Sequence, residues 1–145
     1  MPRTVQIAVD CTDPHTLADW WAETLDWVVE PTDEEFIRRM IAEGMATEED
    51  TTIHRGRLVW KAGAAICRPD QLGRPDRLRF LFQPVPEPKQ GKNRVHWDVR
   101  LDGQDKDEVR AALEARGATY VATHSQGPHS WHVMTDPEGN EFCIS

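Results

Sequence analysis

Hydrophobic and polar positions follow the same order in two separate parts of the chain. Residues 4–10 alternate weakly and carry β-branched side chains, which predicts a strand. Apolar residues between Leu17 and Leu25 then recur at helical spacing and form one face of a predicted helix. Residues 94–101 and 105–116 repeat this sequence of a strand followed by a helix. The repetition predicts two structurally similar halves.

Each of the two predicted strands carries near its start, directly after a valine, a side chain that can bind a metal or form hydrogen bonds. This side chain is Gln6 in the first strand and His96 in the second. Matched polar groups in a duplicated unit suggest two half-sites that face one cavity. We therefore predict that Gln6 and His96 converge on a shared interior cavity. Asp98 follows His96 by two residues, so it is expected on the same face of its strand.

The rest of the pattern predicts short strands after each helix. They are expected at residues 27–29, 79–83, 118–123, 130–135 and 141–144, and at 58–60 with 64–67, which form either one strand kinked at Gly63 or a tight hairpin. Each half then contains a strand, a helix and three further strands, which predicts an α+β protein made of two βαβββ modules. All 145 residues are expected to form one domain, with module one at 1–84, a proline-rich linker at 85–92 and module two at 93–145.

Residues 32–56 have no counterpart in the second half. Thr32 and Glu35 have the spacing of a capping box and begin an amphipathic helix that ends near Gly44. Such an insertion can form a lid over a cavity. An additional packing helix is the commoner outcome and is the expectation here.

Composition argues against several classes of function. A net charge of -8 argues against binding to nucleic acid or to an anionic membrane. The chain shows neither a bilayer-spanning apolar stretch nor a secretory leader, so a cytoplasmic protein is expected. The three cysteines have no close pair, which favours reduced thiols. Phosphate-binding loops, nucleophile elbows and paired CxxC motifs are also absent from the sequence.

Three segments resemble a known superfamily. Val133–Phe142, which contains the turn Asp-Pro-Glu-Gly-Asn, resembles the closing hairpin of the vicinal oxygen chelate superfamily. This superfamily includes glyoxalase I, extradiol dioxygenases, and the fosfomycin and bleomycin resistance proteins. Val5–Val9 and Trp20–Trp27 are similar to its opening strand and helix, and Lys92–Val99 resembles its actinobacterial glyoxalase-like subgroup. The resemblance covers nearly the whole chain outside 32–56.

The resemblance implies curved sheets that form a half-open barrel around a site. In metal-using members, one divalent cation is bound from the first and last strands of each module. Carried over to this chain, those positions are Gln6, Phe80, His96 and Cys143. Phe80 cannot bind a metal, and the other positions lack the carboxylates that such cations need, so no metal is expected. If a divalent metal binds, Gln6, His96 and Cys143 would hold it, because imidazole and thiolate together suit zinc.

The resemblance also places one face of the penultimate strand inside the cavity. Trp131 and Val133 share that face by parity. The residues expected to contact a substrate are Gln6, Trp60, Phe80, Trp131, Val133 and Cys143. Three histidines near this strand are expected in a polar loop and on an outward face, in contact with solvent: His124, His129 and His132.

Two functions stay open at this point. One is a small-molecule enzyme of the isomerase, lyase or ring-modifying kind, in which His96 is the base, Gln6 and Asp98 are polar partners, and Trp131 packs on the substrate. The other is a non-catalytic binding protein of the drug-sequestering kind, which needs an aromatic cavity but no metal. Because members of the superfamily often dimerise, the resemblance also implies a homodimer.

Overall fold

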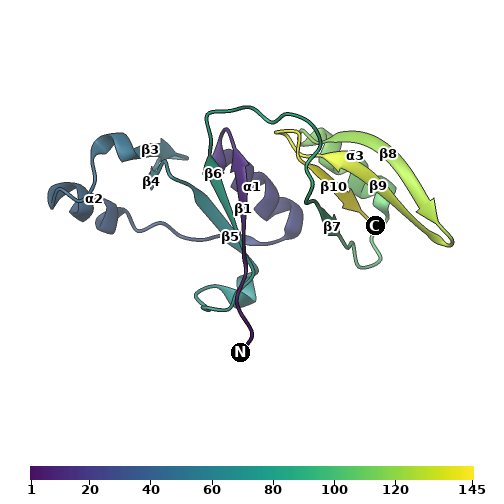
Figure 1. Cartoon of the computed structure of the whole chain (residues 1–145), viewed down its shortest axis with the longest axis horizontal. Helices are drawn as coiled ribbons and strands as arrows, with labels where there is room; N and C mark the ends of the chain where they lie inside the picture. The colour runs from purple at the N-terminus through teal and green to yellow at the C-terminus, as the bar shows by residue number, and fades with distance from the viewer. The chain divides into compact units, whose positions relative to one another are not determined.

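The computed structural model describes every residue from Met1 to Ser145 (Figure 1). The chain divides into two compact units, which we call unit 1 (Met1–Pro88) and unit 2 (Lys89–Ser145). None of its helices has both the length and the apolar character needed to cross a membrane.

Unit 1 is a four-stranded mixed sheet with one helix packed on it. The elements of this layer pair are β1 (Gln6–Cys11), α1 (Pro14–Leu25), β2 (Val28–Val29), β5 (Ala64–Cys67) and β6 (Arg79–Pro84). The strand order is β1-β6-β5-β2, in which β1 and β6 run parallel and the other neighbours run antiparallel. A short 3₁₀ helix, η2 (Pro69–Gln71), follows β5.

Helix α1 forms where the sequence predicts it. Asp13 accepts a hydrogen bond from the backbone N–H of Thr16, and Pro14 occupies the first helical position. The helix ends at Asp26, whose φ of 56° is left-handed. Its apolar face, which includes the fully buried Trp21, packs on β5 and β6 in the core of unit 1.

Unit 2 repeats the arrangement of unit 1. Its elements are β7 (Trp97–Val99), α3 (Lys106–Ala115), β8 (Thr119–Gln126), β9 (His129–Thr135) and β10 (Glu141–Ile144). The order β7-β10-β9-β8 places the first strand beside the last, as in unit 1, and again the first and last strands are parallel. The predicted α+β fold with two βαβββ units is therefore confirmed.

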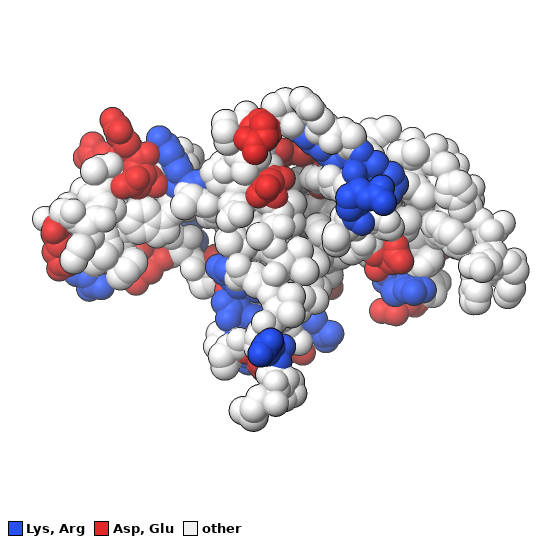
Figure 2. Space-filling model, in the orientation of Figure 1, with Lys and Arg blue, Asp and Glu red and all other residues white.

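The main addition to unit 1 is an arm inserted between β2 and β5. This α2–β4 arm (residues 34–60) contains α2 (Glu34–Ala42), η1 (Glu48–Asp50), β3 (Thr51–His54) and β4 (Arg57–Trp60). Asp33 caps α2 by accepting from the N–H of Phe36, so the predicted capping box that begins at Thr32 is wrong. The hairpin of β3 and β4 was not predicted. Figure 2 shows acidic side chains gathered over this arm.

The predicted polar loop in unit 2 is also wrong. Residues 124–126 and 129–130 extend β8 and β9 into a long hairpin. His132 is buried beneath α3, where its Nε2 lies 2.6 Å from Asp107 Oδ1 and its Nδ1 lies 2.8 Å from Thr123 Oγ1. His132 is thus a hydrogen-bonded residue of the interior, and the helix that covers it comes from a segment 25 residues away.

Candidate functional site

One face of the unit 2 sheet carries most of the residues singled out in module two. Cys143 lies directly opposite Asp98 in the β7–β10 pair and directly opposite Val133 in the β9–β10 pair. Residues directly opposite each other on neighbouring strands share a face of the sheet. The alternate residues, including Met134 and Phe142, are fully buried on the other face. Asp98, Val133 and Cys143 therefore share the opposite face of the sheet from Met134 and Phe142.

A compact cluster of three potential metal ligands forms at this face. The ligand atoms of His96, Asp98 and Cys143 all lie within 4.8 Å of one another. His96 and Asp98 are exposed, whereas Cys143 is only 9% exposed. The cluster thus combines a carboxylate and a thiol on neighbouring strands with an imidazole that directly precedes β7.

A pocket of about 410 Å³ opens beside this cluster. Its wall includes Asp98, Trp131 and Cys143, which the sequence predicts, and Arg100 and His129, which it does not. Arg100 follows Asp98 by two residues, as Asp98 follows His96. Because side chains alternate along a strand, this spacing alone places Arg100 on the same face as the other two. The volume falls in the range of small-molecule sites in proteins, about 300–1,000 Å³.

The thiol in this pocket is held in its neutral form. Burial raises the pKa of Cys143 above its ordinary value, and the neighbouring Asp98 carboxylate raises it further. Cys143 is therefore a protonated thiol near neutral pH. A cation that binds there must displace its proton, which makes binding stronger as pH rises.

In unit 1 the predicted residues fall on two different faces of the sheet. Gln6 is opposite Arg79 in the β1–β6 pair, and its Oε1 accepts a 2.7 Å hydrogen bond from Arg79 Nη1. Phe80 points to the opposite face, where it is 7% exposed and its ring lies 5.1 Å from that of Trp27. Phe80 is thus a core residue that does not share a face with Gln6. The oxygen through which Gln6 would bind a cation already faces a guanidinium group.

Arg79 belongs to a small ion-pair network at the end of this sheet. Its Nε lies 2.8 Å from Glu30 Oε2, and Arg77 Nη2 lies 2.6 Å from Glu30 Oε1. Burial by itself would raise the pKa of Glu30, but the hydrogen bonds from Arg77 and Arg79 outweigh it and hold that pKa below its ordinary value. Two cations thus share one carboxylate.

The Glu30 network predicts a pH-dependent stability. Glu30→Gln is expected to lower the free energy of unfolding by about 1–2 kcal/mol at neutral pH, because both arginines lose their shared carboxylate. The contribution of a carboxyl with a lowered pKa is present above its ordinary pKa and is lost as pH falls through the lowered value. Urea denaturation at pH 7 and pH 3 should therefore show a gap in unfolding free energy between wild type and variant that is smaller in acid. Glu35→Gln, an exposed control on α2, should show no such gap at either pH.

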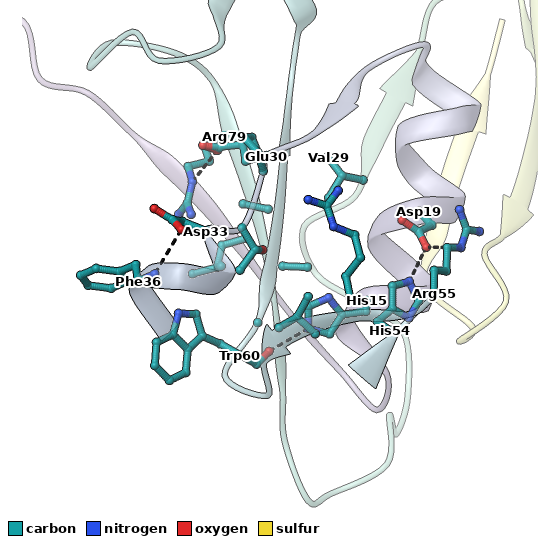
Figure 3. Close-up of a pocket in the computed structure, with 18 residues that line it drawn as sticks. His15, Asp19, Val29, Glu30, Asp33, Phe36, His54, Arg55, Trp60 and Arg79 are labelled. Carbon is teal, nitrogen blue, oxygen red and sulfur yellow. Dashed lines mark hydrogen bonds and ion pairs between the residues drawn. The ribbon is translucent and has the colours of Figure 1, made fainter. Parts of the chain in front are cut away.

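Trp60 lines a second pocket, a cleft of about 510 Å³ that lies entirely within unit 1 (Figure 3). The backbone carbonyl oxygen of Trp60 lies 2.7 Å from His15 Nε2, which ties the α2–β4 arm to α1.

The convergence of Gln6 and His96 on one cavity stays a prediction.

A family model for the glyoxalase-like domain matches residues 6–145. The chain belongs to this family. The match spans both units and includes every residue of the His96–Asp98–Cys143 cluster. The predicted resemblance to the vicinal oxygen chelate superfamily is confirmed at this level, and the actinobacterial subgroup stays a prediction. A sequence search of curated proteins finds no match.

Solved structures show the same fold for this glyoxalase-like protein. The fosfomycin resistance protein FosX of Listeria monocytogenes superposes with a TM-score of 0.62 at 8% identity, over 99% of this chain and 92% of FosX. Glyoxalase I of Leishmania major gives 0.56 at 11% identity, over 99% and 86%. A glyoxalase family protein of Bacillus cereus gives 0.58 at 13% identity, over 99% and 93%. At these identities the likeness establishes the fold alone.

The donor set of this glyoxalase-like protein fits a divalent cation better than the sequence indicated. Asp98 supplies the carboxylate whose absence argues against a metal when only Gln6, His96 and Cys143 are considered. Imidazole, thiolate and carboxylate are all ordinary zinc ligands, and sites with three protein ligands leave one position open to solvent or substrate. Within unit 2, His96, Asp98 and Cys143 are the residues that could hold such an ion.

Proposed function

We propose that this glyoxalase-like protein is an enzyme of the isomerase or lyase kind that acts on a small oxygen-bearing molecule at the open face of the unit 2 sheet. The observation that carries the proposal is the cluster of His96, Asp98 and Cys143, with ligand atoms within 4.8 Å of one another at the edge of a 410 Å³ pocket. Three chemically reactive side chains on one rigid face suit proton transfer or metal binding more than a merely structural role.

The cluster would hold a divalent cation, for which zinc is the best match. A bound cation of this type acts as a Lewis acid that polarises an oxygen of the substrate. Without the cation, His96 and the nearby Asp98 carboxylate supply an acid–base pair, in which His96 takes the proton and Asp98 stabilises the imidazolium.

The pocket walls would select and orient the substrate. Trp131 is half-buried and offers a flat apolar surface, which suits a planar or hydrophobic group. Arg100 is exposed at the same pocket and would pair with a carboxylate or other anionic group of the substrate. The substrate class supported is therefore a small molecule with an apolar part and an acidic or oxygen-rich part.

Metal binding gives the direct test. Purified protein dialysed against zinc should retain about one ion per chain, and His96→Ala should weaken its zinc affinity by at least about tenfold. Equilibrium dialysis with elemental analysis measures both values. His124→Ala is the matched control, because His124 is exposed on β8 and lies outside the cluster. Equal zinc retention by the two variants would contradict the assignment of these ligands.

A second candidate is a non-catalytic binding protein of the drug-sequestering kind. The observation that favours it is the aromatic wall of Trp131 beside a protonated Cys143, which together form a site that needs no metal. Such a protein would bind the same ligand equally well before and after removal of metal by a chelator. The expected homodimer and the expected cytoplasmic location stay predictions.

A further inference from the structure

The cleft in unit 1 is a built cavity of the α2–β4 arm. Its walls come from α1, from β5 and β6 of the sheet, from the connection between β2 and α2, and from the arm. Three contacts hold the arm against α1. His15 Nε2 donates to the carbonyl oxygen of Trp60, because a carbonyl oxygen can only accept. His54 Nε2 and Arg55 Nε lie 2.6 Å and 3.1 Å from Asp19 Oδ2. These contacts fix the hairpin of β3 and β4 against the first turns of α1.

The cleft has an apolar end and a polar end. Figure 3 shows the rings of Phe36 and Trp60 at one end and the imidazoles of His15 and His54 at the other. Phe36 is 40% exposed and Val29, another wall residue, is 38% exposed. Large apolar side chains that remain in contact with water inside a cavity of about 510 Å³ would be covered by a ligand with an apolar body.

The carboxylates that line the cleft already have partners. They are Asp19, Glu30 and Asp33. Asp19 is paired with the guanidinium of Arg55 and lies within hydrogen-bond distance of His54 Nε2, and Glu30 is shared by two arginines. The carboxylate of Asp33 accepts from the N-terminus of α2, where the helix dipole favours negative charge. None of these groups offers an uncompensated negative charge to the cavity.

Arg57 is the lining cation whose guanidinium has no partner in the chain. It lies directly opposite His54 in the β3–β4 pair and therefore shares the face of the hairpin that is turned toward α1. A guanidinium presents several N–H donors in a fixed fork and matches a carboxylate in two parallel hydrogen bonds. The charged side chain of the cleft that has no partner is thus positive, and the geometry of its guanidinium suits a carboxylate.

We propose that this cleft is a second ligand site, separate from the unit 2 pocket, that binds small amphipathic carboxylates with a flat apolar body. Arg57 would pair with the carboxylate, while Phe36 and Trp60 would cover the apolar body. This inference does not rest on the proposed function of unit 2, because the two pockets share no residue.

The test is calorimetric titration of the full chain with 1-naphthoate and with its neutral analogue 1-naphthalenemethanol. Arg57→Gln is expected to weaken naphthoate binding by about tenfold, the effect of losing one charge-assisted pair, and to leave the weaker binding of the alcohol unchanged. Arg38→Gln removes the same charge from an exposed position on the same arm and should leave both affinities within about twofold of wild type.

A third variant separates the two pockets. Arg100→Gln alters the unit 2 pocket and should not change naphthoate binding if the ligand occupies unit 1. The proposal is overturned if Arg100→Gln rather than Arg57→Gln weakens binding, if Arg57→Gln and Arg38→Gln behave alike, or if wild-type protein fails to bind naphthoate at millimolar concentration. Circular dichroism of each variant establishes that its fold is intact before titration.

Discussion

Asp136→Ala is expected to destabilise unit 2 by about 3 kcal/mol, because a charged acceptor that serves several buried donors is removed. Asp136 is only 2% exposed. Its Oδ1 accepts from the N–H groups of Glu138 and Asn140 at 2.9 and 3.0 Å, and its Oδ2 accepts from Asn140 Nδ2 at 3.0 Å. Without the carboxylate, the buried amides of Asn140 lose their acceptor. The midpoint of urea denaturation measures the loss.

Two control variants distinguish the contribution of this turn to stability from the general effect of losing an acidic residue. Asp70→Ala removes an exposed carboxylate and should change stability by less than about 0.5 kcal/mol. Asp136→Asn retains one acceptor oxygen and should lie between Asp136→Ala and wild type. Equal midpoints for the two alanine variants would show that the Asp-Pro-Glu-Gly-Asn turn contributes little to stability.

Gly63→Ala is expected to destabilise unit 1 by about 3 kcal/mol through a backbone clash. A Cβ atom on Gly63 would lie 2.5 Å from the carbonyl oxygen of Phe82, which belongs to the paired strand β6. The Phe82 carbonyl is held within β6, and Gly63 directly precedes β5, so relieving the clash must shift the adjacent β5–β6 pairing. Thermal unfolding followed by circular dichroism measures the change in stability.

Gly44→Ala is the matched control for this substitution. Gly44 has a left-handed φ of 76° but open space around its Cβ position, so alanine there carries only the conformational cost of about 1 kcal/mol. If the two variants were equally stable, the close approach of Gly63 to Phe82 would not be what excludes a side chain at that position.

Strand parity explains why part of the candidate site was predictable from sequence. Because side chains alternate along a strand, Asp98 is expected beside His96, and Trp131 beside Val133, without any knowledge of the partner strand. Phe80 shows where this reasoning fails. It lies in a run of three apolar residues that does not alternate, so its facing depends on the register between β1 and β6.

Long-range contacts and an unusual turn account for the other errors. The β3–β4 hairpin turns at Arg55 and Gly56, both with positive φ, as a two-residue hairpin turn requires. Arginine is a rare choice there, so the usual Asn-Gly or Asp-Gly signal is missing. Asp98 is missing from the predicted ligand set because positions carried over from the family, rather than the distances among neighbouring side chains, define that set.

The α2–β4 arm has a consequence for how this family can diversify. It is inserted into the connection between β2 and β5, so its length and composition can vary while both four-stranded sheets keep their order. Mutations that change the arm would alter the unit 1 cleft that it lines. The arm is therefore the part of unit 1 in which sequence change can remodel a recess while the underlying sheet stays the same.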